Sequence, residues 1–359
     1  MPPCRATVAI DPTTDIVLAT AGDEVEDFTW QDAERLIRFG PGALADAPAL
    51  LAERGFDGYV LLTTERARGQ APELLDGASA VLHVPGGLVP EAATAVRDQV
   101  EGRPIVALGG GRVLDAAKAI SAADGPPCAA VPTTLAGSPI TRVHRLPEGV
   151  SGVDLVRPSL VVADPDLSAS QPMPDLAASA MNALAHAVES LYAPRRSPVT
   201  EMAAMRAAAS IAGGLGRVVR DRHRLALGAV LASWAVGATG YSVHHPVCQT
   251  LVAGVGTPHA ATNAVLLPHS VRFAAPRAPG PVGRLALALG AERADPELAA
   301  DLVAALAAHA GPTRLSELGV SWGDIGEVVE AVFGRAELDE TPGGHPEERE
   351  LRKLLEAAL

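Results

Sequence analysis

One short segment, residues 104–118, limits the fold of this chain more than any other. An apolar run at 104–108 is typical of a buried strand, the glycines 109–111 follow it, and apolar side chains then recur at helical spacing. A strand, a glycine turn and a helix in this order bring backbone N–H groups and a helix N-terminus up to a phosphate. Glycine suits such a turn because a side chain would block the phosphate and because turns often need a positive φ. Leu114 stands where the Rossmann fingerprint has its third glycine, so the segment alone is equally compatible with a simple tight turn.

The first half of the chain alternates between strand-like and helix-like segments. Strands are predicted from the apolar runs at 59–64, 80–84, 104–108, 128–131 and 161–163. This alternation predicts an α/β domain built on a parallel, doubly wound sheet. Because ligands of such sheets bind beyond the carboxyl ends of the strands, Thr64, the glycine turn and the loop after residue 131 are expected at one edge.

The composition changes near residue 165. Strand-like runs nearly vanish beyond it, and alanine-rich helical periodicity predicts helices at 175–192, 199–213, 222–240, 259–273, 296–310 and 346–359. We therefore expect an α/β domain over residues 1–165 and a helical domain over residues 166–359.

Charge and cysteine content exclude several classes of function. The net charge is -13, which argues against nucleic acid or an anionic membrane as partner. The three cysteines are widely spaced and form no disulfide framework. The N-terminus shows no secretory leader, and no apolar run approaches the roughly 20 residues that span a bilayer. We expect a cytoplasmic protein that acts on a small molecule.

Hydroxyl groups are concentrated in the loop after the strand at 128–131. Thr133, Thr134 and Ser138 lie there together with Gly137. Such a loop suits a ribose, an amide or a phosphate, although an ordinary Ser/Thr turn explains it more simply when it is taken alone.

Four polar residues of the second half have the spacing of metal ligands. Asn182 and His186 share one face of a predicted helix, and His245 and His259 could complete a four-ligand set. An Asn/His pair at this spacing is more often a core hydrogen-bond pair. The amide of Asn182 is also a neutral ligand, whereas three imidazoles can hold Zn²⁺ or Fe²⁺ without it.

Several segments together resemble the iron-containing alcohol dehydrogenase superfamily, which has a dehydroquinate-synthase-like fold. The resemblance is strongest to the maleylacetate reductase branch and spans roughly residues 35–315. The matching segments are 39–43 (FGPGA), 82–85 (LHVP), 109–118, 132–138 (PTTLAGS), 164–165 (DP), 181–192 (MNALAHAVESLY) and 244–259.

The resemblance implies an NAD(P)-binding domain, a helical domain and an active site in the cleft between them, in a homodimer. Maleylacetate reductases use NAD(P)H to reduce the double bond of maleylacetate to 3-oxoadipate. The implied cofactor site comprises Thr64, Gly109, Gly110, Gly111, Arg112, Thr133, Thr134 and Ser138. In metal-dependent relatives an aspartate replaces Asn182, and the other ligands match His186, His245 and His259. Maleylacetate reductases tend to have asparagine there, which weakens the metal site.

Departures from the family pattern cluster at the expected substrate end. Gln249 stands where the family has a histidine that carries a proton, and glutamine does not titrate. Arg112 replaces a serine, Pro139 replaces a glutamate, and residues 339–342 lack an arginine of the family. Neither NAD nor NADP is favoured.

Two hypotheses follow. The first is an NAD(P)H-dependent reductase of an enone, oxo acid or aldehyde, in which His244, His245 or water supplies the proton beside Gln249. The alternative is an enzyme of specialised metabolism that has lost redox chemistry and catalyses a proton transfer, elimination or cyclisation. A protein that only binds a ligand would leave the histidines unexplained.

Overall fold

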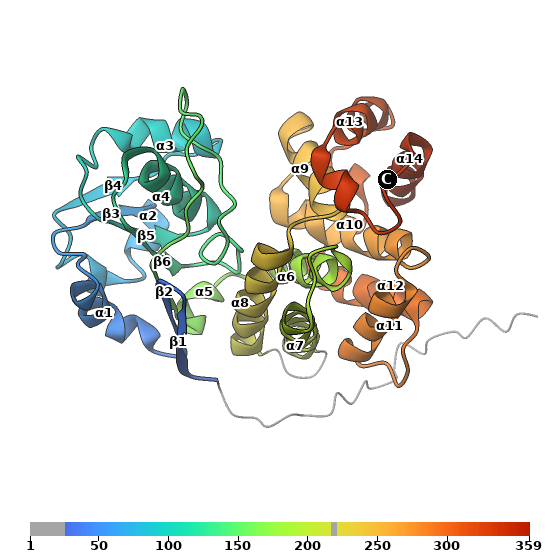
Figure 1. The fold of residues 1–359 in the computed structure, drawn as a ribbon, viewed down its shortest axis with the longest axis horizontal. Coiled ribbons are helices and arrows are strands. Elements are labelled where there is room, and N and C mark those ends of the chain that lie inside the picture. Colours follow the sequence, from blue (N-terminus) through green and yellow to red (C-terminus); the bar gives the residue numbers. More distant parts are fainter. Residues whose placement is uncertain (1–25, 217–220) are drawn as a thin grey trace, which may run out of the picture.

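A seven-stranded sheet forms the centre of the first half of the chain (Figure 1). The computed structural model describes residues 26–216 and 221–359. The strands, in spatial order, are β1 (Phe28–Asp32), β2 (Arg35–Phe39), β7 (Leu160–Ala163), β6 (Cys128–Pro132), β5 (Ile105–Gly109), β3 (Val60–Thr63) and β4 (Ala80–His83). All neighbours pair in parallel except β1, which forms an antiparallel hairpin with β2. The predicted parallel sheet is therefore present, with one antiparallel strand added at this edge.

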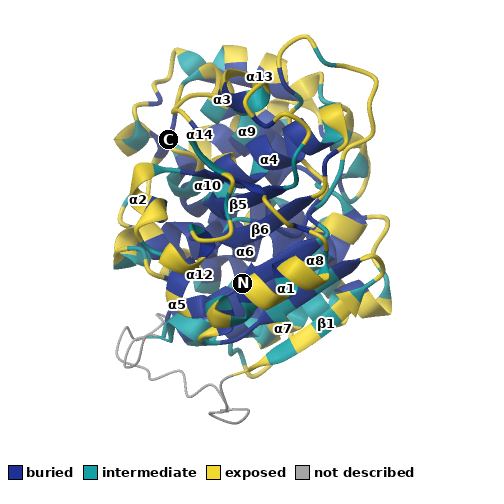
Figure 2. Cartoon of the chain, turned by 90° about the vertical axis from the view of Figure 1, so that its left-hand side faces the viewer, coloured by how far each residue is buried: buried dark blue, intermediate teal, exposed yellow. Residues whose placement is uncertain are grey.

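Helices cover both faces of the sheet, as its side-chain alternation requires. On β5, Ile105 and Ala107 join the core formed with α3 (Val89–Arg97) and α4 (Gly111–Asp124). The intervening Val106 and Leu108 pack on the other face, against α1 (Ala47–Glu53) and α2 (Glu65–Arg68). Figure 2 shows β5 and β6 buried in the interior, with exposed residues on α1 and α2. The sheet is thus buried on both faces, which is typical of parallel sheets.

The second half of the chain is helical. Its helices are α5 (Pro165–Ser168), α6 (Met173–Tyr192), α7 (Pro198–Gly214), α8 (Arg222–Thr239), α9 (His244–Gly254), α10 (His259–Ala274), α11 (Pro279–Ala288), α12 (Pro296–Ala307), α13 (Asp324–Phe333) and α14 (Glu348–Ala358). The six helices predicted from periodicity are confirmed, whereas α5, α9, α11 and α13 were not predicted. All residues of α6 from Leu176 to Tyr192 are buried, so α6 is the central helix.

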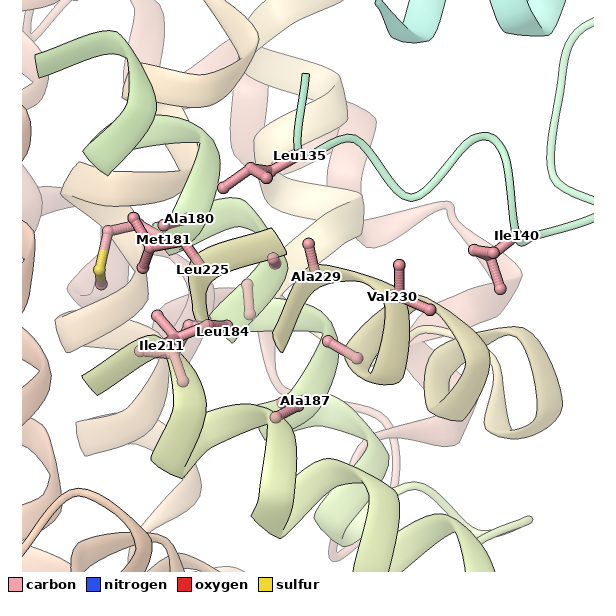
Figure 3. Close-up of a cluster of buried hydrophobic side chains, with 14 of the residues drawn as sticks. Leu135, Ile140, Ala180, Met181, Leu184, Ala187, Ile211, Leu225, Ala229 and Val230 are labelled. Carbon is pink, nitrogen blue, oxygen red and sulfur yellow. The ribbon is translucent and has the colours of Figure 1, made fainter. Parts of the chain in front are cut away.

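The two halves share one hydrophobic core. Leu135 and Ile140, on the loop after β6, approach the helices that carry Met181 and Val230 (Figure 3). The same loop and α8 line a small cavity. At the edge of the sheet, the Trp30 ring lies 5.6 Å from that of Trp234 on α8. These contacts join the halves on both sides of β7.

Within residues 26–216 and 221–359, no single helix is long and apolar enough to cross a membrane. The pair α8 and α9 meets that test only when joined, and the two helices are bent by 100° relative to each other.

Candidate active site

The glycine turn lies at the carboxyl edge of the sheet. Gly109 ends β5, Gly110 precedes α4 and Gly111 is the first residue of this helix. None of the three has a positive φ, so that part of the expectation is wrong. Close packing explains the glycines instead, because a Cβ on Gly109 would lie 2.8 Å from the side chain of Val113. On Gly110 it would lie 3.1 Å from that of Thr134. The turn stands at the N-terminus of α4, a position where backbone N–H groups can bind an anion.

A buried polar network fixes the loop after β6 against α4. Lys118 is fully buried, lies 2.8 Å from Asp115 Oδ1, and donates to the backbone oxygens of Thr141 and Val143. The hydroxyl of Ser138 donates to the same carboxylate. One lysine and one aspartate therefore hold the loop that carries the predicted nicotinamide-side residues.

The structure places the other predicted cofactor residues along the same edge. Thr133 is buried, and its N–H donates to the Gly109 oxygen at 2.9 Å. The Thr64 hydroxyl accepts from the Ala67 N–H at 3.2 Å and so caps α2. Arg112 is exposed in the first turn of α4. Thr134 packs against Gly110, as described above, whereas Thr64 belongs to a different loop.

The loop after β6 also reaches the predicted metal-binding residues. A Cβ on Gly137 would lie 2.8 Å from His186 Cε1 and 3.2 Å from Ser233 Oγ. Glycine at this position lets the backbone of the first domain approach the imidazole of the second. The hydroxyl loop and the histidines therefore form one site between the two halves.

One face of α6 supplies three polar side chains to this site. Asn182, His186 and Glu189 follow each other at i, i+4 and i+7, and all are buried. Among the buried polar atoms without a hydrogen-bond partner in the described chain are Asn182 Oδ1 and His186 Nδ1. Burial lowers the pKa of His186 well below its ordinary value, so its imidazole is neutral.

Glu189 links α6 to the start of α9. Its Oε1 accepts from the backbone N–H groups of Ser242, His244 and His245 at 3.0, 2.9 and 3.4 Å, and its Oε2 contacts His245 Nδ1. The N-terminus of a helix favours a carboxylate. Burial opposes this and raises the pKa of Glu189 to about 7. When Glu189 is ionised, His245 donates from Nδ1, and its Nε2, which has no partner among the described atoms, presents a lone pair.

Three rings are stacked at the centre of the site. The ring of His245 lies 4.6 Å from that of His186 and 4.4 Å from that of Tyr241, with interplanar angles of 12° and 18°. Neither Tyr241 nor Glu189 was predicted as a functional residue. Glu189 carried a detectable signal, since it lies three residues after His186 on the same predicted helix.

His244, predicted as a candidate proton donor, lies behind this stack. It is fully buried, and its ring nitrogens lie 2.9 Å from Ser270 Oγ and 2.9 Å from Asn263 Oδ1. Burial lowers its pKa to about 3. With both nitrogens engaged, His244 has no free group to offer a substrate.

The arrangement of the histidines does not fit a preformed metal site. In the described part of the chain, no three His, Cys, Asp or Glu side chains converge as ligands of one ion. Imidazole ligands direct lone pairs in the ring plane, so the parallel rings of His186 and His245 cannot converge on an ion between them. His259, at the first position of α10, is exposed. Asn182 adds only a neutral oxygen. A bound metal would require these rings to turn.

Gln249 lies on α9, one helical turn after His245, and is partly buried. Arg335 donates to its side-chain oxygen from the segment after α13. Gln249 was identified from the sequence, whereas Arg335, which is 86 residues away in the chain, was not.

Comparisons with known proteins agree with this architecture. Residues 35–165 match the family model of iron-containing alcohol dehydrogenases, and residues 176–359 match the model of the C-terminal part of the Fe-containing alcohol dehydrogenase family. The chain is 35% identical over 322 residues to maleylacetate reductase 1 of Rhodococcus opacus, covering 83% of this chain and 88% of the relative. Identity to the maleylacetate reductase of Pseudomonas aeruginosa is 34% over 316 residues, covering 81% of this chain and 86% of that relative.

Solved structures give the same result for the fold. The maleylacetate reductase from Agrobacterium tumefaciens superposes with a TM-score of 0.80 at 28% identity, covering 93% of this chain and 98% of that chain. The enzyme from Rhizobium sp. strain MTP-10005 gives 0.79 at 28% identity, with the same coverage. The predicted fold class, an α/β domain with a parallel sheet followed by a helical region, is confirmed.

Proposed function

The chain belongs to the iron-containing alcohol dehydrogenase family, and we propose that it reduces the carbon–carbon double bond of maleylacetate with NAD(P)H. The family uses NAD(P) and a divalent metal, so the predicted NAD(P)H-dependent reductase and its cofactor classes are confirmed at this level, without specifying the metal. The non-redox alternative is not favoured, because the similar proteins described above are reductases.

The proposed reaction is a conjugate reduction. A hydride leaves C4 of the dihydronicotinamide with its electron pair and forms a bond to the alkene carbon distant from the ketone. The double bond shifts and the ketone oxygen takes the negative charge of an enolate. A proton then adds to the carbon next to the ketone, which gives 3-oxoadipate and NAD(P)⁺. The enzyme must therefore hold C4 of the nicotinamide close to the alkene carbon that accepts the hydride, and it must stabilise the negative charge that develops on the ketone oxygen.

The cofactor site supports this reaction at the carboxyl edge of the sheet. We assign the pyrophosphate to the turn Gly109–Gly111, where α4 begins, with the guanidinium of Arg112 as a counter-charge. Thr133, Thr134 and Ser138 then flank the nicotinamide, on the loop that Gly137 brings against His186. The ring would face the histidines of α6 and α9, where the substrate must lie.

We propose His245 as the side chain that relays the proton: the lone pair on its Nε2 takes up a proton and passes it to the substrate carbon. Its Nε2 has no hydrogen-bond partner in the described chain, while its Nδ1 is bonded to Glu189, which fixes the ring. We assign His244 a packing role, since both of its nitrogens are bonded away from the site. A family metal would polarise an oxygen of the substrate, but the stacked rings give no ligand set for it, and we derive no step from it.

Three further features are part of the proposal. We place the boundary between the cofactor domain (residues 1–165) and the helical domain (residues 166–359) at the end of the sheet, just after β7. A homodimer is proposed from the family resemblance alone. A cytoplasmic location is supported by the free, buried thiols of Cys128 and Cys248.

The proposal is tested with the purified full chain. Titration with NADH and with NADPH should show binding of at least one of them by nicotinamide fluorescence. Loss of nicotinamide absorbance should then require maleylacetate, with 3-oxoadipate identified by mass spectrometry. Binding without turnover of maleylacetate would refute the substrate, and no binding of either dinucleotide would refute the reductase.

A further inference from the structure

The role of Gln249 follows from what holds it. This residue is one helical turn from His245, so it lies on the same face of α9 as the proposed proton donor. Its side chain is partly buried. A glutamine carries an acceptor oxygen and an NH₂ group with two donors, and only the network around it decides which end faces the substrate.

Arg335 fixes that choice. The segment between α13 and the 3-10 helix Ala336–Glu340 places its guanidinium against α9, where Nη2 donates to Gln249 Oε1 at 2.7 Å. A guanidinium has five donors and no acceptor, so the atom facing it must be the amide oxygen. The NH₂ group of Gln249 is therefore the free end. In residues 26–216 and 221–359, it makes no hydrogen bond to the protein.

Glu337 holds the arginine in turn. Its Oε1 accepts from Arg335 Nη2 at 2.5 Å, and the Arg335 side chain is only 20% exposed. The Arg335 guanidinium lowers the pKa of Glu337, and the positive charge of Arg145 lowers it further. The charge of Arg335 is thus balanced by that of Glu337.

We propose that Arg335 and Glu337 hold Gln249 as a hydrogen-bond donor that binds the ketone oxygen of the substrate and stabilises the enolate formed by hydride transfer. The inference rests on the function proposed above. Hydride addition moves an electron pair from the alkene onto that oxygen, and a proton later adds to carbon, so Gln249 gains and loses no proton. An amide oriented in advance acts in the manner of an oxyanion hole. This explains how a residue that cannot titrate serves at a position where the family has a histidine.

The isosteric variant Gln249→Glu gives the sharpest test. A carboxylate keeps the shape of the side chain and still accepts from Arg335, but it has no donor for the enolate and repels its charge. We expect kcat for maleylacetate to fall about 100-fold or more, with the dissociation constant of NAD(P)H unchanged. A glutamine with only a structural role would tolerate this change.

Arg335 is tested as a positioning residue with Arg335→Met. This variant frees the amide of Gln249, so kcat should fall about tenfold while KM changes little. In the Gln249→Glu background the same change should cause no further loss, and Arg335→Lys should restore part of the activity. Arg349→Met is the matched control, because Arg349 also pairs with a glutamate two residues away but is 75% exposed.

Three results would overturn the inference. Gln249→Glu with nearly normal kcat would show that no donor is needed. A raised KM with normal kcat in Arg335→Met would mean that the arginine binds the substrate itself. A wild-type enzyme that binds NAD(P)H but does not reduce maleylacetate would remove the proposed function, and with it the enolate, before any variant is compared.

Discussion

Glu189 should contribute more to stability through its oxygens than through its charge. Its carboxyl group accepts from three backbone N–H groups at the start of α9 and contacts His245 Nδ1, and it is fully buried. In Glu189→Ala these four groups lose their partner, and each unsatisfied buried group costs about 1–3 kcal/mol. Water entering the vacated space would satisfy some of them, so we expect a net loss of about 3–5 kcal/mol.

Glu189→Gln separates the two contributions. The amide oxygen still accepts from the three N–H groups, so the loss should be only about 1 kcal/mol, for the missing charge at a helix N-terminus. The amide NH₂ then donates to His245 Nδ1, which moves the ring proton to Nε2. Nε2 then no longer presents the lone pair that takes up the proton, so turnover should fall in this variant although the fold is kept.

The assay is urea unfolding of both variants, compared by their midpoints at unchanged m-values. Glu201→Ala is the control, because Glu201 forms a partly exposed pair with Arg284 and should cost no more than about 1 kcal/mol. Equal stability of the Ala and Gln variants at position 189 would refute the reasoning, since it would show that the backbone groups do not need the acceptor.

Three further predictions concern the first domain. Gly109→Ala should destabilise the fold by about 1–3 kcal/mol, because its Cβ would lie 2.8 Å from the Val113 side chain. Gly111→Ala is the control, because its Cβ would lie at an ordinary 3.4 Å from Ala136 Cβ, and it should leave the midpoint of urea unfolding unchanged. Lys118→Met should cost about 3 kcal/mol in the same assay, since it leaves Asp115 and two backbone oxygens without their buried donor. Burial lowers the pKa of His144 in the folded chain. Below about pH 6.5 the unfolded chain therefore binds a proton that the folded chain does not bind, so the free energy of unfolding decreases as the pH is lowered. His144→Gln should make this acid-side loss shallower, and an unchanged slope would contradict it.

Local patterns were sufficient for much of the fold. The run of apolar residues before Gly109 and the helical spacing after Gly111 appear in the structure as β5 and α4. The long helix around Asn182 and His186 was also predicted, because its periodicity extends over five turns. In these segments, burial and backbone preference favour the same conformation.

Tertiary packing decided the rest. The helix α9 begins with a His-His-Pro sequence that has weak helical preference, and its N-terminus is satisfied by Glu189 from another helix. The contact between Gln249 and Arg335 joins residues far apart in the sequence, so no spacing could predict it. Stacking of Tyr241 on His245 likewise depends on how α8 turns into α9. The positive φ expected in the glycine turn is wrong, and side-chain crowding explains glycine at positions 109 and 110 instead.

Transfer of a labelled hydride tests the central claim most directly. The enzyme would be given maleylacetate with NADH, or NADPH if that binds more tightly, carrying deuterium at C4 of the nicotinamide, and the product analysed by mass spectrometry and NMR. We predict one deuterium in 3-oxoadipate, on the former alkene carbon distant from the ketone. Turnover of maleylacetate to a product without that deuterium, or deuterium on the ketone carbon as an alcohol, would contradict the account.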